Sequence, residues 1–370
     1  MLDKENNYYN PVNYMMNYFI IDKIIIAALE EDMPMGDITT DNIIPPSSRS
    51  VARLIAKADG VIAGLDVAAR VFILLDPEIA FNQLIKDGNK VKKGDVICEI
   101  EGSTAAMLKA ERTALNLLQH MSGIATATAS FCSRIREDSD SGFEASTLAD
   151  NELFPTTKTS TKAYSSKASG TEGIGTKVFG TEEAGKKATD IEALDTKASG
   201  TDIEIQTKKP KKIVRITDTR KTAPGLRYLD KYAVRMGGGS NHRFNLSDGV
   251  LIKDNHIAAA GGIKPAVERV RRNIPHTVRI EVETENLIQV QEALEAEVDI
   301  IMLDNMSLQM MKEAVCLING RALSEASGNV SLENVKEIAS TGVDIISIGS
   351  LTHSISAFDI SMKFFPSESH

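Results

Sequence analysis

The chain has 370 residues, of which 42% are hydrophobic and 25% are charged, and its formal net charge is -9. This length predicts two domains, or one large barrel with a smaller unit. The composition is that of a globular protein. We expect neither a nucleic acid nor a membrane as a partner. Cys98, Cys132 and Cys316 lie far apart, with no Cys or His at a metal-ligand spacing, which favours buried thiols in a reduced, cytoplasmic location over reactive cysteines.

The first twenty residues form an Asn- and Tyr-rich tail. Asp3 and Glu5 stand where a secretion signal would carry basic residues, and the apolar run that follows, IDKIIIAAL, is interrupted by Asp22 and Lys23. This segment therefore predicts neither a signal peptide nor a membrane span.

We expect residues 21–128 to form an N-terminal α/β domain, with the C-terminal residues 355–370 packed back on it. EDMPMGDITTD is a polar, turn-rich link after a helix, SVARLIAKADGVIAGL alternates like antiparallel strands, and VKKGDVICEIEG is a further strand. From Ser103 to Ile135, apolar residues recur at three- and four-residue steps. That spacing predicts a long helix, which we expect to be broken near Gly123.

Residues 138–210 are rich in Thr, Ser, Gly, Ala, Lys and Glu, and KASGT occurs at Lys167 and again at Lys197. The segment has few large apolar side chains, and burying them cannot offset the conformational entropy lost on ordering it. We therefore expect a low-complexity, flexible insertion. A repeat-built binding module is the alternative, although the repeats lack the apolar spine that a solenoid needs.

We expect residues 129–137 and 211–354 to form a catalytic α/β barrel. After the insertion, short apolar runs such as KKIVRIT, VDIIMLD and VDIISIG alternate with helical patterns such as NLIQVQEALEAE. This alternation is typical of parallel βα units. Five or six units in succession, with no GxGxxG turn opening the first one, favour a barrel over an open doubly wound sheet.

Charged side chains stand at the ends of three predicted strands. Lys253 and Asp304 each close a strand, and in TVRIEVET the charged residues Arg279, Glu281 and Glu283 share one side. Since helices cover the outside of a parallel barrel, this charged side must face its interior, with Glu283 nearest the C-terminal mouth. Two acids and a base from different strands are how a barrel builds an active site.

Two stretches of opposite charge would face each other if both border the predicted mouth. Residues 211–243 contain nine basic and two acidic side chains, whereas residues 281–304 contain eight acidic side chains and no basic one. A charge run is usually a solvated face. Arg220, Lys221 and Arg243 adjoin turn residues and glycines, however, which favours binding of a carboxylate or phosphate by planar guanidinium groups. His242, taken alone, is more often structural.

Two strand-to-helix turns near the end of the barrel predict a phosphate site. They are Ser327-Gly328-Asn329 and Gly349-Ser350. Backbone N–H groups at such turns, aided by the helix dipole, bind phosphate, and late barrel strands are the usual position. Ordinary helix caps are the alternative interpretation.

Together these residues resemble the quinolinate phosphoribosyltransferase family. The matching motifs occur in the family's order and are GDITTD, ERTALNLLQHMSGIAT, DTRKTAPGLR, KYAVRMGGGSNHRFNLSDGVLIKDNH, the strand ends EVE and LDN, ASGN and IGSLTHS. The resemblance implies an N-terminal α/β sandwich-like domain and an incomplete TIM-like α/β barrel. It also implies phosphoribosyl transfer from phosphoribosyl pyrophosphate to quinolinate with decarboxylation. The products are nicotinate mononucleotide, CO2 and pyrophosphate, the reaction belongs to NAD biosynthesis, and Mg²⁺ is the cofactor.

The same resemblance implies roles for individual residues. Quinolinate would be surrounded by Arg220, His242, Arg243 and Lys253, with Arg112 contributed across the interface of a homodimer or an assembly of dimers. The phosphoribosyl pyrophosphate side would comprise Lys221, Glu283, Asp304, Ser327, Gly328, Asn329, Gly349, Ser350 and His353. Lys253, Glu283 and Asp304 would be catalytic, and Glu283 and Asp304 would hold the metal, directly or through water. Ala223 replaces a Thr that is usual in the family, with little expected effect, and Arg227 receives no role.

Two other hypotheses stay open from the sequence. A related phosphoribosyltransferase of the same fold could use a different aromatic acid, although the retained basic residues argue against it. A non-catalytic scaffold could bind a partner through the insertion, although the intact Lys253, Glu283 and Asp304 argue against that.

Overall fold

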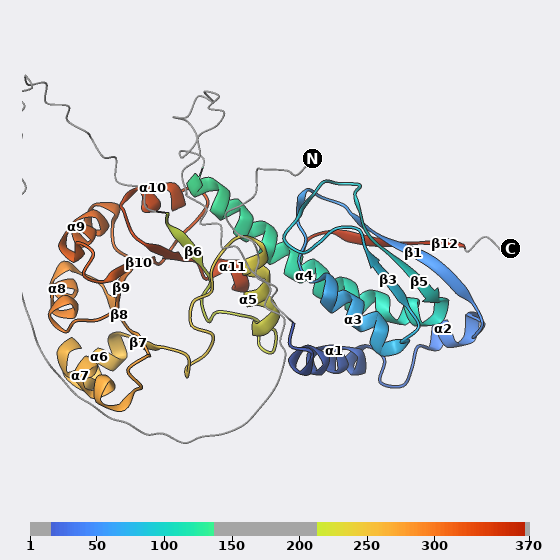
Figure 1. Cartoon of the computed structure of the whole chain (residues 1–370), viewed down its shortest axis with the longest axis horizontal. Coiled ribbons are helices and arrows are strands. Elements are labelled where there is room, and N and C mark those ends of the chain that lie inside the picture. The colour runs from blue at the N-terminus through green and yellow to red at the C-terminus, as the bar shows by residue number, and fades with distance from the viewer. Residues whose placement is uncertain (1–15, 137–212, 367–370) are drawn as a thin grey trace, which may run out of the picture. The chain divides into compact units, whose positions relative to one another are not determined.

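The computed structural model describes residues 16–136 and 213–366 (Figure 1). The expected tail lies largely outside this range, in residues 1–15, and the expected insertion lies wholly outside it, within residues 137–212. Among the described helices, none is long and apolar enough to cross a membrane.

The N-terminal domain contains an antiparallel sheet with the strand order β12-β1-β5-β3. Its strands are β1 (Arg49–Ala56), β3 (Ala80–Gln83), β5 (Val96–Ser103) and β12 (Ile360–Pro366). Two short strands, β2 (Gly60–Val61) and β4 (Lys90–Val91), form a separate pair. Because β12 pairs with β1 from Ser50 to Ala56, the C-terminal segment completes the sheet of this domain.

Four helices accompany this sheet: α1 (Tyr18–Asp32), α2 (Ile38–Ile43), α3 (Leu65–Leu75) and α4 (Thr104–Arg136). Helix α1 begins inside the segment expected to be a tail, where the Asn17 side chain accepts a hydrogen bond from the Phe19 amide. Asp37 caps α2 in the same way. The prediction that EDMPMGDITTD is a turn-rich link along its whole length is therefore wrong. The sequence did not predict α3.

Helix α4 runs through Gly123 without a break, so the predicted interruption is wrong. A Cβ atom at Gly123 would lie 2.2 Å from the backbone oxygen of Ser356. The glycine therefore allows a close backbone approach, and burial of neighbours such as Leu118 and Ile124 offsets its helix cost of about 1 kcal/mol.

The Gly123→Ala variant is expected to lower the free energy of unfolding by about 1–3 kcal/mol, because overpacking against Ser356 outweighs the gain in helix propensity. Urea unfolding followed by circular dichroism measures the difference. Ser133→Ala on the exposed side of the same helix is the control, with an expected change within about 0.5 kcal/mol. A Gly123→Ala protein as stable as the wild type would contradict the close-approach explanation.

The second domain is an incomplete barrel of six parallel strands in the order β6-β11-β10-β9-β8-β7. The strands are β6 (Arg215–Thr217), β7 (Val250–Ile252), β8 (Ile280–Thr284), β9 (Ile300–Asp304), β10 (Leu323–Ser327) and β11 (Ile345–Ser347). Strands β6 and β7 are the two ends of the sheet, which confirms the predicted parallel but incomplete barrel.

Helices cover the outside of this barrel, as Figure 1 shows for α7, α8 and α9. Their bounds and those of the other helices are α5 (Arg227–Met236), α6 (Asp254–Ala260), α7 (Ile263–Asn273), α8 (Leu287–Glu295), α9 (Leu308–Ile318), α10 (Val335–Ser340) and α11 (Ser350–His353). Ser327 on β10 lies opposite Asp304 on β9, so the C-terminal ends of neighbouring strands are level. This register brings residues from successive strand ends to one mouth.

The cysteines follow the sequence prediction in two of three cases. Cys98 and Cys132 are buried, and burial raises the pKa of the two thiols to about 12 and about 11. Cys316 is exposed on α9, so the expectation of a buried thiol is wrong there.

Candidate active site

A cavity of about 890 Å³ lies at the mouth of the barrel and gathers nearly all the residues that the sequence singled out. Its lining includes Arg220, Lys221, His242, Arg243, Lys253, Glu283, Asp304, Ser327, Gly328, Asn329, Gly349, Ser350 and His353. Arg112 is different, because it is exposed on α4 and does not line this cavity.

Arg220, Arg243 and Lys253 form what we call the basic wall of the cavity. One of its arginines lacks a full set of hydrogen-bond partners among the described residues. Nε of Arg220 is buried and has no hydrogen-bond partner among the described residues. Arg243 donates to the Gly249 carbonyl at 2.8 Å, and burial, together with repulsion by Arg220, lowers the pKa of the Arg243 guanidinium. A buried donor without an acceptor is costly, so this wall is suited to an anionic ligand.

Arg227, which received no role from the sequence, braces the loop that carries this wall. Its Nε donates to the Thr222 hydroxyl at 2.9 Å, and its terminal nitrogens approach the carbonyls of Arg220 and Phe244 at 3.4 and 3.5 Å. The loop is also held from the other side, where the Thr352 hydroxyl donates to the Lys221 carbonyl at 2.8 Å.

A buried ion pair between Asp218 and Lys231 anchors the loop that carries His242. Asp218 and Lys231 are 0% and 1% exposed as whole residues, and Lys231 Nζ lies 2.6 Å from Asp218 Oδ1. Asp218 also accepts from the Asn241 side chain at 2.7 Å and from the His242 amide at 2.8 Å. Burial raises the pKa of Asp218 and lowers that of Lys231, while their mutual attraction opposes both changes.

The acidic side of the cavity is formed by two strand ends. Lys253 Nζ lies 2.5 Å from Glu283 Oε2, and Asp304 Oδ2 accepts from the Asn305 amide group at 2.8 Å. The predicted base and two acids therefore meet at one mouth, with one acid already paired to the base.

The first predicted phosphate turn requires its glycine. Gly328 has φ of +97°, and a Cβ atom there would lie 2.1 Å from Oδ1 of Asn305. Asn329 is also left-handed, with φ of 49°, and its amide group donates to the same Asn305 oxygen at 3.1 Å. The second turn is tight as well, because a Cβ atom at Gly349 would lie 3.0 Å from Cδ of Lys221.

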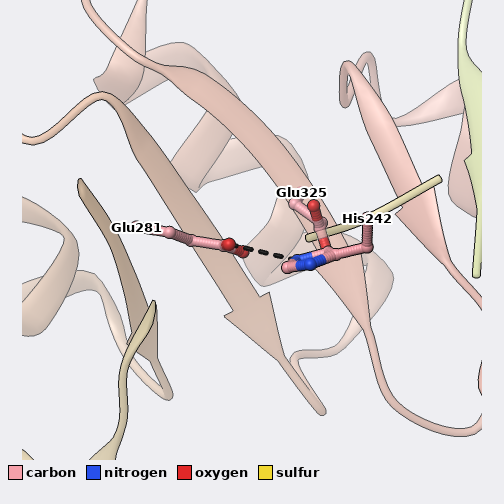
Figure 2. Close-up of side chains that lie close together, drawn as sticks. All are labelled: His242, Glu281 and Glu325. Carbon is pink, nitrogen blue, oxygen red and sulfur yellow. Dashed lines mark ion pairs between the residues drawn. The ribbon is translucent and has the colours of Figure 1, made fainter. Parts of the chain in front are cut away.

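His242 faces two glutamates from different strands (Figure 2). Its Nε2 lies 3.1 Å from Glu281 Oε2 and 3.6 Å from Glu325 Oε1. Nδ1 of the ring accepts the Arg243 amide at 2.8 Å. Both ring nitrogens therefore face protein groups, although the ring lines the cavity.

Two effects compete for the protonation of His242. Burial lowers its pKa, whereas the hydrogen bond and charge of Glu281 and the charge of Glu325 raise it, with a net upward direction. A doubly protonated ring, however, could not accept the Arg243 amide at Nδ1. Because this amide belongs to the backbone and its position is fixed, Nδ1 stays an acceptor, and the ring is neutral with its hydrogen on Nε2.

Comparison with known protein families gives the decisive observation. The model of the quinolinate phosphoribosyl transferase C-terminal domain matches residues 198–363, and that of the N-terminal domain matches residues 37–122. The chain belongs to the quinolinate phosphoribosyltransferase family. Both of the domains described above therefore have counterparts in this family, and their order along the chain is the same.

Individual relatives are similar to this chain over nearly its whole length. A probable nicotinate-nucleotide pyrophosphorylase [carboxylating] from Synechocystis is 37% identical, over 95% of this chain and 95% of the relative. A protein from Bacillus subtilis with the same description is 35% identical, over 94% of each chain. The crystal structure of NadC from Streptococcus pyogenes matches with a TM-score of 0.72 and 36% identity, over 94% of this chain and 97% of that one.

Three features of this member of the quinolinate phosphoribosyltransferase family were not assigned to the site from its sequence. They are the ion pair of Asp218 and Lys231, the brace from Arg227 and the position of Glu325 beside His242. Glu325 carried a usable signal, because a charged residue in the strand RALSEAS is unusual for a barrel interior. The sequence around Arg227 gave no such signal, because the contacts of this side chain depend on how the loop folds.

Proposed function

We propose that this chain transfers the phosphoribosyl group of phosphoribosyl pyrophosphate to quinolinate and decarboxylates the product, giving nicotinate mononucleotide, CO2 and pyrophosphate in NAD biosynthesis. The single observation that supports it most is the cavity at the barrel mouth, where a basic wall faces an acidic pair and two glycine turns. In that wall the buried Nε of Arg220 has no hydrogen-bond partner within the described part of the chain. The names of the relatives give the same activity.

The basic wall suits a dianion. Arg220, Arg243 and Lys253 provide positive charge for two carboxylates, and a monocarboxylate would leave part of that charge unpaired. Fixing both carboxylates also orients the ring nitrogen for attack on the ribose carbon. The reaction needs no protein nucleophile.

The acidic pair suits the other half of the reaction. Departure of pyrophosphate leaves positive charge on the ribose ring, which the carboxylates of Glu283 and Asp304 stabilise. Once the ring nitrogen is ribosylated it is cationic, and it then accepts the electron pair of the adjacent carboxylate as CO2 leaves. The turns at Gly328 and Gly349 line the same cavity, and in this proposal they would hold the phosphate groups.

The acidic residues at the cavity fit a bound Mg²⁺ ion. Carboxylate oxygens are its preferred ligands, and Glu283 and Asp304 both line the cavity. Because Lys253 already neutralises Glu283, Asp304 is the better candidate for direct contact, with Glu283 acting through water. When bound, the ion would neutralise charge on the diphosphate as it leaves.

Arg112 is proposed to act in a neighbouring subunit. It lies exposed on α4 and outside the cavity of its own chain. A homodimer, or an assembly of dimers, would bring it to the partner's quinolinate.

A cytoplasmic location likewise stays a prediction.

The proposal is tested by incubating the purified protein with phosphoribosyl pyrophosphate, Mg²⁺ and either quinolinate or nicotinate, and measuring the nucleotide by chromatography. Product from quinolinate alone is expected. Product from nicotinate or another acid, but not from quinolinate, would favour the related transferase with a different acceptor. No product from any acid would favour a scaffold.

A further inference from the structure

Asn305 follows Asp304 at the end of β9, and the sequence gave this residue no role. It lines the active-site cavity, and its backbone is left-handed, with φ of 52°. Among the described residues, four that are not glycine have a positive φ, and two of these, Asn305 and Asn329, line this cavity. Backbone conformations of this kind gather at functional sites, where the surrounding structure holds them in place.

The side-chain amide of Asn305 lies between the candidate metal ligand and the first phosphate turn. Its Nδ2 donates to Asp304 Oδ2 at 2.8 Å, and its Oδ1 accepts from the Asn329 side chain at 3.1 Å. An ionised carboxylate can only accept hydrogen bonds, so the amino group must face Asp304 and the amide oxygen must face the turn. The two neighbours therefore fix the orientation of this amide.

The phosphate turn is packed directly on Asn305. The Asn305 backbone N–H donates to the Ser327 carbonyl at 2.9 Å, and the next residue, Gly328, has no room for a Cβ atom beside Oδ1 of Asn305. The Asn329 carbonyl in turn accepts from the side chain of Asn334, the residue before α10, at 2.9 Å. A change in the position of this turn must therefore be felt by the Asn305 amide.

The same amide leaves Asp304 with one oxygen available for a cation. Oδ2 accepts from Asn305, and no described residue donates a hydrogen bond to Oδ1. Carboxylates that bind a metal are commonly held in this way by a neighbouring donor, and loss of such a donor weakens metal binding by roughly 10- to 100-fold.

We propose that Asn305 is the positioning residue that connects the metal-binding acid with the phosphate turn. It holds Asp304 with Oδ1 available for Mg²⁺, and it holds the turn that would bind the diphosphate of phosphoribosyl pyrophosphate. A cation at Asp304 and a diphosphate at the turn then favour the same orientation of one amide, so each tightens the binding of the other. This inference rests on the proposed function.

A simpler explanation is that asparagine stands at this position because it tolerates a left-handed backbone. Asn305→Gly separates the two explanations, because glycine adopts the same φ, keeps the N–H that bonds to Ser327 and removes only the amide. Asn319→Gly is the matched control. Asn319 is also left-handed, with φ of 44°, but it is exposed at the end of α9 and does not line the cavity.

Calorimetry with phosphoribosyl pyrophosphate at a series of Mg²⁺ concentrations, in the absence of quinolinate, measures binding without turnover. The Mg²⁺ concentration that gives half of the maximal affinity is expected to rise about tenfold or more in Asn305→Gly and to stay within about twofold in Asn319→Gly. KM for quinolinate, measured at saturating Mg²⁺ and phosphoribosyl pyrophosphate, should stay within about twofold in both variants. Urea unfolding checks that both variants are folded.

A second variant tests the other contact of the amide. Asn329→Gly removes the donor to Asn305 Oδ1 but keeps the bond from Asn305 to Asp304, so its Mg²⁺ requirement should shift in the same direction by a smaller factor. If Asn305→Gly does not fold, this variant decides, and an unchanged Mg²⁺ requirement in it would overturn the inference.

Two results with a folded Asn305→Gly protein would overturn the inference while leaving the proposed function intact. An unchanged Mg²⁺ requirement would show that the residue serves only the backbone turn, and an equal loss of quinolinate affinity would show a general disturbance of the mouth. A wild-type protein that neither binds phosphoribosyl pyrophosphate nor forms the nucleotide would instead overturn the proposed function, and the inference with it.

Discussion

Arg220→Ala is expected to reduce kcat/KM for quinolinate by about 10²–10³-fold, since truncating one partner of a desolvated charge pair costs roughly 2–5 kcal/mol. The reason is Nε of Arg220 on the basic wall, which has no partner in residues 16–136 and 213–366 and is therefore available for a substrate carboxylate. Stability should change little, because the contact from Arg227 is to the backbone oxygen of Arg220 and survives the substitution. Steady-state kinetics and urea unfolding measure the two effects.

Two matched variants sharpen this test. Arg220→Lys keeps the charge but loses the planar fork, so its kcat/KM should lie between those of the wild type and Arg220→Ala. Arg272→Ala removes an exposed arginine on α7 and should have normal kinetics. Near-normal turnover by Arg220→Ala would mean that quinolinate binds elsewhere.

Asp218→Ala is expected to lower the free energy of unfolding by about 3–5 kcal/mol, because it leaves the ammonium group of Lys231 buried without its partner. Activity should fall with it, since Asp218 also holds the His242 amide and the Asn241 side chain. Urea unfolding at neutral pH gives the stability, and the quinolinate assay gives the activity.

The double variant Asp218→Leu/Lys231→Met distinguishes the unpaired charge from a general packing defect. Removing both charges should recover a large part of the lost stability but not the activity, because the loop anchor stays absent. Glu99→Ala breaks the exposed pair with Arg53 and should cost less than about 1 kcal/mol. If Asp218→Ala cost no more than Glu99→Ala, the buried pair would not be the anchor.

The barrel and most of its mouth could be predicted from the sequence for a definite reason. Alternation in TVRIEVET places Glu281 and Glu283 on the same side of β8, and strand ends in a parallel barrel meet at one edge. Glu283 and Asp304 therefore lie at one cavity with Lys253, as the strand ends predicted. The family resemblance added the roles of these residues, which periodicity alone does not give.

Contacts between residues far apart in the chain could not be predicted. Gly123 resembles a helix breaker until the backbone of Ser356 is placed beside it. The partner of Asp218 lies 13 residues away on α5, and Glu325 meets His242 only once β10 has paired within the sheet. Cys316 was expected to be buried from its residue type, whereas its position on α9 leaves it exposed.

Phosphoribosyl transfer and the loss of a carboxylate are proposed to take place in one cavity. This proposal is tested most directly with quinolinate labelled in the carboxylate next to the ring nitrogen, by measuring labelled CO2, nicotinate mononucleotide and pyrophosphate in the same reaction. Equal amounts of all three products are expected, with none formed when phosphoribosyl pyrophosphate is omitted. Pyrophosphate release with the label retained in the nucleotide would contradict it.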